Sequence, residues 1–476
     1  MNKSRYLLLS LAAIVIVGGA IFGQRYYATR QKWNAQRPSL PAAVGAEAPE
    51  LDVRLANCAN RFQSWPPDQA ALAEFTRLCH ANGQLESAIS GYQALVYLQP
   101  NDPHWPHLLA SILAGFGRLD EALPLLRRTT QLAPDHVVGW LRLGDALFKS
   151  NATTDAESAY QEVLKRAPGN PYALLGLARC DLQTERWTAA RSHLQQAVAT
   201  DAKFADAQSL LASVFERLGN PEGAAQARAR LQGGGHYTEA PDDWTEELIG
   251  YCHNPYTLLT AASSAVADGN PRKALAPLQR ALTIAPNDPR IHRQLAKVLY
   301  TLKEPAQARV EMERAVALAP TDENMQFDLV DLLKNTKDHD ALARAVAAGV
   351  VACPNSAALR FEAGLLAVEA GKTEEAEQHF QFAWQNRPDN PAAARELATL
   401  FFQTNRGEAG VGVLEKVLAR KPQNTGVHVQ LVQHGIDTGD PRTTEWMRRA
   451  LNSGAPELPS AELQQNYERR FGRTLR

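Results

Sequence analysis

Apolar residues recur along most of this chain with the spacing of helices. In residues 137–170, one helix face is marked by four residues at i, i+3, i+4 and i+7: Trp140, Leu143, Gly144 and Leu147. A second face is marked by three residues at i, i+4 and i+7: Ala156, Tyr160 and Val163. Pro168 then ends the second helix, because a proline ring cannot continue the helical hydrogen bonds. The pattern predicts two helices packed face to face.

This two-helix pattern repeats with a period of 34 residues. In the second half of the chain the period is marked by six prolines: Pro286, Pro320, Pro354, Pro388, Pro422 and Pro456. The first half shows Pro100, Pro134 and Pro168, and Ala202 where the next proline is due. A fixed period of this length is typical of stacked helix pairs, so the sequence predicts an all-α solenoid. Solenoids bind partners along extended surfaces, which favours a binding function over catalysis.

The residues that fill the repeat resemble those of the tetratricopeptide repeat (TPR) family. Its small and apolar slots recur in other units: Leu109, Ala110 and Ala122; Ala261, Ala262, Ala274 and Ala281; Leu295, Ala296, Ala308 and Ala315; Ala363, Gly364, Ala376, Phe380 and Ala383. Glycines mark the turns between paired helices: Gly83, Gly117, Gly219, Gly269, Gly371 and Gly439. Two units depart from the pattern at the position where a small residue is usual: one has Leu342 there and the other has Gly410. The resemblance implies a right-handed superhelix of helix-turn-helix units with a groove for protein partners.

The repeats divide the chain into segments. Five units are expected before residue 232 and six after residue 254, which makes about eleven in all. The expected segments are a basic N-terminal tail (1–5), a transmembrane signal-anchor (6–23), a linker with a lead-in helix (24–68), a first TPR array (69–231), a Gly-rich and acidic insert (232–254), a second TPR array (255–456) and a C-terminal capping helix (457–476).

The insert at 232–254 does not follow the repeat. It begins with a flexible run of three glycines at 233–235. Asp242 or Asp243 is suited to cap a short helix that carries Trp244. We expect a hinge and cap that covers the end of the first array, with Trp244 packed into a groove. An acidic docking site is the alternative.

The N-terminal segment predicts membrane insertion. Residues 6–22 carry no charge, and 17 helical residues extend over about 26 Å, the short end of a single span. We favour an uncleaved anchor over a removed signal peptide, because no convincing small-residue cleavage site follows. Basic residues stand on both sides of the span. The expected location is the inner membrane with a periplasmic solenoid, and a cytoplasmic orientation is the alternative.

Composition narrows the chemistry. Fifty basic and 51 acidic residues give a net charge of −1, which argues against nucleic acid as a partner. The five cysteines have no disulfide-framework spacing. The sequence lacks a metalloprotease motif, a haem-attachment motif, a phosphate-binding glycine loop and a nucleophile elbow. We therefore expect a protein that is not an enzyme and has no cofactor.

Three histidines form a candidate metal cluster. The resemblance implies that slots 2, 5, 9, 12 and 13 of each unit line the inner groove, and in the first array these slots contain His80, His104 and His107. His104 and His107 share a helix face, so the three side chains are candidates for converging on a metal ion. The favoured interpretation is three exposed histidines in a polar groove, because no fourth ligand is visible.

The same slots in the second array give the candidate partner-binding residues: Arg290, Arg293, Lys297, Tyr300, Phe327, Phe361, Arg395 and Phe402. Basic and aromatic side chains together suit an extended peptide with acidic groups or a terminal carboxylate. A solvated helix face with packing aromatics is the alternative. The carboxylate clamp of chaperone-binding relatives has Lys, Asn and Asn where this chain has Arg293, Lys297 and Asp328, so that ligand is not supported.

These observations predict a membrane-anchored scaffold that recruits partner proteins in a bacterial-type cell envelope. Two alternatives stay open. One is a carrier of a metal or small ligand that uses the histidines. The other is an accessory subunit of an envelope enzyme complex for cytochrome maturation, secretion or polysaccharide assembly, an analogy of architecture alone.

Overall fold

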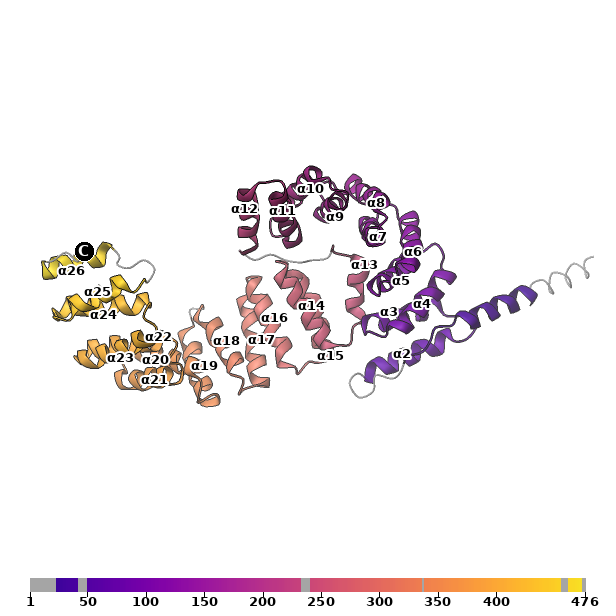
Figure 1. Cartoon of the computed structure of the whole chain (residues 1–476). Helices are drawn as coiled ribbons and strands as arrows, with labels where there is room; N and C mark the ends of the chain where they lie inside the picture. Colours follow the sequence, from indigo (N-terminus) through magenta and orange to yellow (C-terminus); the bar gives the residue numbers. More distant parts are fainter. Residues whose placement is uncertain (1–22, 42–48, 233–239, 336–337, 455–460, 473–476) are drawn as a thin grey trace, which may run out of the picture. The chain divides into compact units, whose positions relative to one another are not determined.

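The structure is a computed structural model that describes residues 23–41, 49–232, 240–335, 338–454 and 461–472. These residues are mostly helical and contain no β-strand, as the repeat pattern predicts (Figure 1). Apart from residue 23, the expected span at 6–23 lies outside the described residues. Within them, no helix has the length and apolar character needed to cross a membrane.

The chain forms two compact units, Met1–Pro286 (unit 1) and Asn287–Arg476 (unit 2). Their boundary lies one helix pair later than the array boundary expected from the sequence. The physical reason is that the first pair of the second array is bonded to the insert. Arg280 of this pair donates a 3.0 Å hydrogen bond from Nε to the carbonyl of Cys252.

Unit 1 begins with a helix at 23–36, whose Trp33 is fully buried and packs edge-on against Phe62 at 6.5 Å between ring centroids. Its further helices are α2 (Pro49–Phe62), α3 (Gln69–Ala81), α4 (Leu85–Leu98), α5 (His104–Gly115), α6 (Leu119–Leu132), α7 (Val137–Lys149), α8 (Thr153–Arg166), α9 (Pro171–Gln183), α10 (Trp187–Thr200), α11 (Ala205–Arg217), α12 (Pro221–Gln232), α13 (Asp243–Glu246), η2 (Glu247–Tyr251), α14 (Pro255–Ala267), η3 (Pro271–Ala274) and α15 (Leu275–Ile284).

Unit 2 continues with helix pairs of the same kind and ends with a single helix. Its elements are α16 (Pro289–Thr301), α17 (Pro305–Leu318), α18 (Glu323–Lys334), α19 (His339–Ala352), α20 (Ala357–Glu369), α21 (Thr373–Asn386), α22 (Pro391–Gln403), α23 (Gly407–Arg420), α24 (Thr425–Thr438), α25 (Thr443–Asn452) and α26 (Ala461–Phe471). Helix α26 buries Leu463 and Tyr467 in the apolar core formed with α24 and α25.

Short polar residues start the first helix of most repeats. Asp68 accepts a hydrogen bond from the amide of Ala71, and Asn390 accepts one from the amide of Ala392. Each bond satisfies an amide that has no partner within its own helix. The turn between paired helices needs a left-handed residue, which glycine adopts without strain. Gly83 has a φ of +77° there.

Aromatic rings fill the space between neighbouring helices where glycine leaves room. The ring of Tyr160 lies between Gly144 and Gly176, and a Cβ atom at either glycine would come within 2.6 Å of it. The Tyr160 hydroxyl donates a 2.8 Å hydrogen bond to Asp145. Phe380 packs in the same way against Gly364. The residues at the apolar slots of the sequence therefore make the contacts that hold each helix pair to the next.

Candidate functional site

The insert of unit 1 folds back onto the first helices of the repeats. These first helices contact one another in succession, α5 with α7 and α7 with α9, and so form one continuous face. Helix α13 contacts α5 (Figure 1). The short helix η2 contacts α3. The side chain of Asn82, at the end of α3, donates a 2.9 Å hydrogen bond to the carbonyl of Tyr251 and accepts a 2.6 Å bond from the amide of His253. The insert is thus hydrogen-bonded to this face rather than only placed beside it.

Trp244 is the aromatic anchor of the insert. Its ring lies parallel to that of His136, with centroids 3.7 Å apart and an angle of 8° between the planes. The His104 ring lies 4.2 Å away, and the His107 ring meets Trp244 edge-on at 5.0 Å. Three histidines therefore surround one indole. The sequence predicted that Trp244 packs into a groove, and the structure places it against α5 and the start of α7.

A buried histidine and a buried carboxylate, joined by a hydrogen bond, stand beside this anchor. His107 Nε2 lies 2.8 Å from Asp242 Oδ2, and the two side chains are 0% and 4% exposed. Burial raises the pKa of Asp242, but the hydrogen bond and charge of His107 outweigh it and hold that pKa well below its usual range. Arg142 of α7 adds a positive charge 4.0 Å from the same carboxylate. Asp242 is therefore ionised, and it also accepts a hydrogen bond from the amide of Thr245 at the start of α13.

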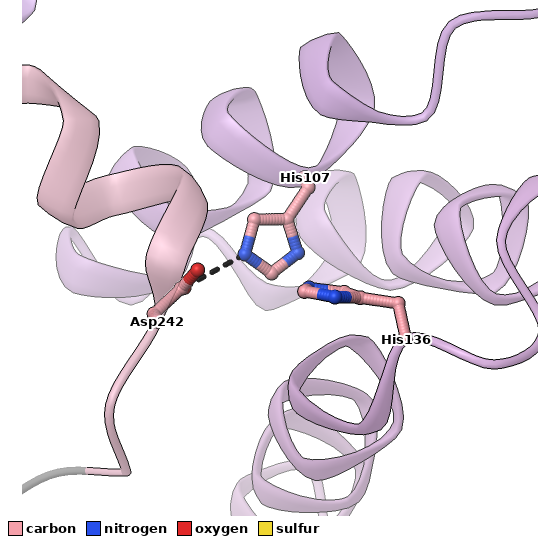
Figure 2. A group of neighbouring side chains, drawn as sticks. All are labelled: His107, His136 and Asp242. Atoms are coloured by element: carbon pink, nitrogen blue, oxygen red, sulfur yellow. Dashed lines mark hydrogen bonds and ion pairs between the residues drawn. The ribbon is translucent and has the colours of Figure 1, made fainter.

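His136 completes the cluster. It precedes α7 and lies with its ring perpendicular to that of His107, at 5.3 Å between centroids (Figure 2). One ligand atom from each of His107, His136 and Asp242 lies within 4.8 Å of the others. Burial, followed by the charge of His107, lowers the pKa of His136 to about 4. The ring is thus neutral at physiological pH.

The structure separates the three histidines that the sequence grouped. His107 belongs to the cluster. His104 stacks on Trp244, and its Nδ1 pairs with Asp102 at 2.7 Å. His80 instead lies 3.1 Å from the Tyr92 hydroxyl, outside the cluster. The alternative interpretation, convergence of His80, His104 and His107, is therefore not the arrangement observed. The favoured one, three exposed histidines, does not hold for His107, whose side chain is 0% exposed because the insert covers it.

Sequence reasoning missed two members of the cluster for different reasons. His136 is at the N-cap position of α7, which is not one of the groove slots of the repeat. Asp242 lies in the insert, whose residues have no phase relative to the repeat. The Asp242–Asp243–Trp244 run after the glycines was the available signal, because it joins a capping residue to a large aromatic side chain. The position at which it docks depends on contacts between residues far apart in sequence.

In unit 2 the predicted basic residues are paired with carboxylates. Arg290 forms a 2.6 Å ion pair with Asp288. Arg293 and Lys297 both bind Asp328 of α18, at 2.5 Å and 2.8 Å. Two cations therefore share one anion on this face, and the basic character expected from the sequence is reduced but not removed.

Two of the predicted aromatic residues line a common pocket of about 330 Å³. Phe327 comes from α18 and Phe361 from α20, and the pocket lies at the N-terminal ends of α18, α20 and α22. Glu323 and Arg387, 3.7 Å apart, form part of the wall. Asn324 and Asn390 add side-chain amides. The pocket thus combines an apolar floor with hydrogen-bonding groups.

The remaining predicted residues occupy different environments. Tyr300 is 39% exposed on α16. Arg395 bonds Gln430 of α24 at 3.4 Å, a contact between neighbouring repeats. Phe402 stacks on His434 at 3.7 Å, and its ring fills the space beside Gly410. Phe402 therefore contributes to packing between α22, α23 and α24.

Comparison with known proteins identifies the repeat. One family model described as tetratricopeptide repeat matches residues 147–214, 265–345 and 367–433, and a second of the same description matches 107–171. The matched ranges together cover more than half of the chain. The chain is a tetratricopeptide repeat protein. The resemblance of the repeat residues to this family is thus confirmed.

Two curated proteins share part of this TPR chain. It is 31% identical over 166 residues to the cellulose synthase operon protein C of Escherichia coli (strain K12), which covers 34% of the chain and 13% of that protein. It is 30% identical over 92 residues to the small glutamine-rich tetratricopeptide repeat-containing protein 2 of Mycosarcoma maydis, which covers 19% of the chain and 26% of that protein. The chain thus spans a small part of the length of either relative.

Two solved structures are similar to this chain at low sequence identity. The PilF protein of Pseudomonas aeruginosa is 18% identical with a TM-score of 0.37, over 45% of this chain and 96% of that one. Yeast Tom70 is 13% identical with a TM-score of 0.32, over 84% of this chain and 94% of that one.

Proposed function

We propose that this TPR protein is a non-catalytic scaffold that binds an extended segment of a partner protein on unit 2. The observation that carries the proposal is the pocket lined by Phe327 and Phe361, which lies on the first helices of consecutive repeats. In unit 1 the corresponding helices α3 and α5 are in contact with the chain's own insert. The pocket of unit 2 is therefore the better candidate for a partner.

The chemistry of the pocket defines the segment that fits. A volume of about 330 Å³ with two phenylalanines suits one large apolar side chain. The amides of Asn324 and Asn390 are suited to hydrogen-bond the backbone of an extended peptide. Arg293 and Lys297 carry one more positive charge than Asp328 neutralises, which favours an acidic residue nearby in the same segment.

A site-specific crosslinking experiment tests this proposal. A photoreactive amino acid replaces Phe361 in the full chain, and irradiation in native membranes is followed by mass spectrometry. The matched control replaces Val351, which is 82% exposed on α19, the second helix of its pair. We expect one partner to crosslink at Phe361 and not at Val351, and the Phe327→Ala substitution to reduce its yield. Equal crosslinking at both positions, or none at Phe361, contradicts the proposal.

We also propose that residues 6–23 anchor the protein in the inner membrane with the repeats in the periplasm. The support is the uncharged run at 6–22 in the sequence. All five natural cysteines are buried thiols, so one cysteine introduced at exposed Leu218 provides a selective label. A membrane-impermeant maleimide should label it in spheroplasts. Labelling only after lysis would show the opposite orientation. If high salt released all of the protein from the membrane fraction, the proposed anchor would be contradicted.

An accessory role in polysaccharide assembly is a second candidate. It is favoured by the 31% identity to the cellulose synthase operon protein C over 166 residues. The crosslinking experiment separates this role from the other envelope functions. An accessory role in polysaccharide assembly predicts that the captured partner belongs to a polysaccharide synthase or export complex. A captured secretion or cytochrome-maturation protein would exclude it.

A further inference from the structure

Two buried ring nitrogens beside Trp244 lack a hydrogen-bond partner among the described residues. They are Nδ1 of His107 and Nε2 of His136. A buried polar atom without a partner costs roughly 1–3 kcal/mol, so such atoms are rare unless water or an ion satisfies them. Here two of them occur in one cluster, together with the Asp242 carboxylate.

The cluster has the chemistry of a metal site. Two imidazoles and a carboxylate are the ligand set of many zinc centres, with a fourth position for water. His107 is 0% exposed and Asp242 is 4% exposed, so the donors are held in a protected position. The three side chains converge from α5, from the residue preceding α7 and from the insert (Figure 2).

We propose that His107, His136 and Asp242 form a binding site for a divalent transition-metal ion of the zinc class. The donor atoms lie within 4.8 Å of one another. Donors on one tetrahedral zinc ion are about 3.4 Å apart. His107 Nε2 and Asp242 Oδ2 are 2.8 Å apart, so an ion held by these two atoms replaces the proton of their hydrogen bond and separates them slightly, while His136 moves toward it by about 1 Å. Nitrogen ligands favour zinc, nickel, cobalt or copper over magnesium or calcium.

One neighbouring charge opposes the ion and sets the expected strength. Arg142 Nε lies 4.0 Å from Asp242 Oδ2. A positive charge at this distance weakens cation binding, and the site has only three protein ligands. We therefore expect micromolar affinity, as for an exchangeable ion, rather than the much tighter binding of a four-ligand structural site.

Metal binding would join parts of the chain that are far apart in sequence. His107 and His136 belong to the first array, whereas Asp242 belongs to the insert that follows it. An ion shared by these ligands fastens the insert to the face of α5 and α7. This site is in unit 1 and does not depend on partner binding by unit 2, so the two proposals can fail separately.

Titration of the full chain with zinc alone tests the site. The protein is first dialysed against a chelator, and binding is followed by calorimetry and by tryptophan fluorescence, because Trp244 stacks on His136 at 3.7 Å. We expect one zinc ion per chain. The His136→Phe substitution keeps an aromatic ring against Trp244 and removes the nitrogen, and Asp242→Asn keeps the shape of the carboxylate. Each should weaken binding at least tenfold.

Matched controls separate this site from other histidines. His104→Phe changes the other ring that stacks on Trp244, and His80→Phe changes a histidine outside the cluster, so both should bind zinc as the wild type does. Trp244→Phe should lose the fluorescence change. Circular dichroism verifies that each variant is folded. Undiminished zinc binding by folded His136→Phe and Asp242→Asn variants, or no uptake by the wild type at 100 µM (about ten times the expected Kd), overturns the proposal.

Discussion

Asp242 accepts a hydrogen bond of 2.8 Å from Nε2 of His107, although the two residues are 135 positions apart in the chain. Both side chains are almost completely buried. Removing one member of such a pair leaves an uncompensated polar group in a buried site, which is costly even where the intact pair adds little stability. We therefore expect this bond to hold the insert on the face of α5 and α7, together with the hydrogen bonds of Asn82 and the stacking of Trp244.

The first prediction concerns release of the insert. In chelator-treated protein, Asp242→Ala removes the partner of His107 and the cap of α13. We expect a loss of up to about 3 kcal/mol in the free energy of closing the insert. Amide hydrogen exchange at 243–251 should then accelerate by more than tenfold. Asp243→Ala, at the exposed neighbouring position, is the control and should change exchange little. Equal protection in both variants would show that other contacts hold the insert.

The repeat architecture was accessible from the sequence because its signals are local. The apolar residues that mark each helix lie three or four positions apart, and the small residues that admit a ring recur in phase with them. Tyr160, Gly144 and Gly176 illustrate this, since the ring contacts its own repeat and the next one. The residues of each unit therefore predict its helix pair, and the same pattern recurs in each of the eleven expected units.

The site was less accessible because its contacts are not local. The groove slots identify His107, but they do not reveal that Asp242 returns to meet it. In the second array, the groove slots identify Arg293 and Lys297 as basic residues of the binding face. The carboxylate that pairs with both cations, Asp328, lies in the next repeat. Phase indicates which face a residue occupies. It does not indicate which charge from another repeat or from the insert neutralises it.

The second prediction uses two glycines of one helix. A Cβ atom at Gly410 of α23 would lie 2.4 Å from the Phe402 ring, which is itself stacked on His434. Gly410→Ala should therefore destabilise unit 2 by about 1–3 kcal/mol. A Cβ atom at Gly412 meets nothing within 4 Å. Gly412→Ala should stabilise the helix by about 0.5–1 kcal/mol. Thermal unfolding measures both, and shifts of the same sign would refute this account of the packing.

The third prediction concerns pH. Burial lowers the pKa of His80 to about 4, whereas an unfolded histidine titrates near 6.5. The unfolded state therefore takes up the proton first as the pH falls. The stability linked to His80 is complete above about pH 7 and is lost progressively as the pH falls toward 4. Between pH 7 and pH 5 we expect a loss of roughly 1–2 kcal/mol from this residue.

Urea unfolding at the two pH values, compared between wild type and His80→Phe, checks the pH prediction. The variant removes the titrating group and should lose less stability between pH 7 and pH 5. His379→Phe is the comparison in unit 2, because burial also lowers the pKa of His379. An identical pH dependence in wild type and His80→Phe would exclude His80 as a source of acid sensitivity.

The fourth prediction concerns the charge of the proposed partner-binding face. Asp328 binds both Arg293 and Lys297, so Asp328→Asn leaves two cations without their shared anion. Attraction for an acidic peptide should then increase about two- to fivefold, since a surface charge contributes below about 1 kcal/mol. Arg293→Glu combined with Lys297→Glu should weaken capture and leave helical content unchanged.

Asp331→Asn removes an exposed carboxylate on the same helix and is the matched control for net charge. Crosslinking yield at Phe361 measures each variant, and the gain in Asp328→Asn should decline with added salt. Equal gains in Asp328→Asn and Asp331→Asn would show that overall charge, rather than the Arg293–Lys297 pair, attracts the partner.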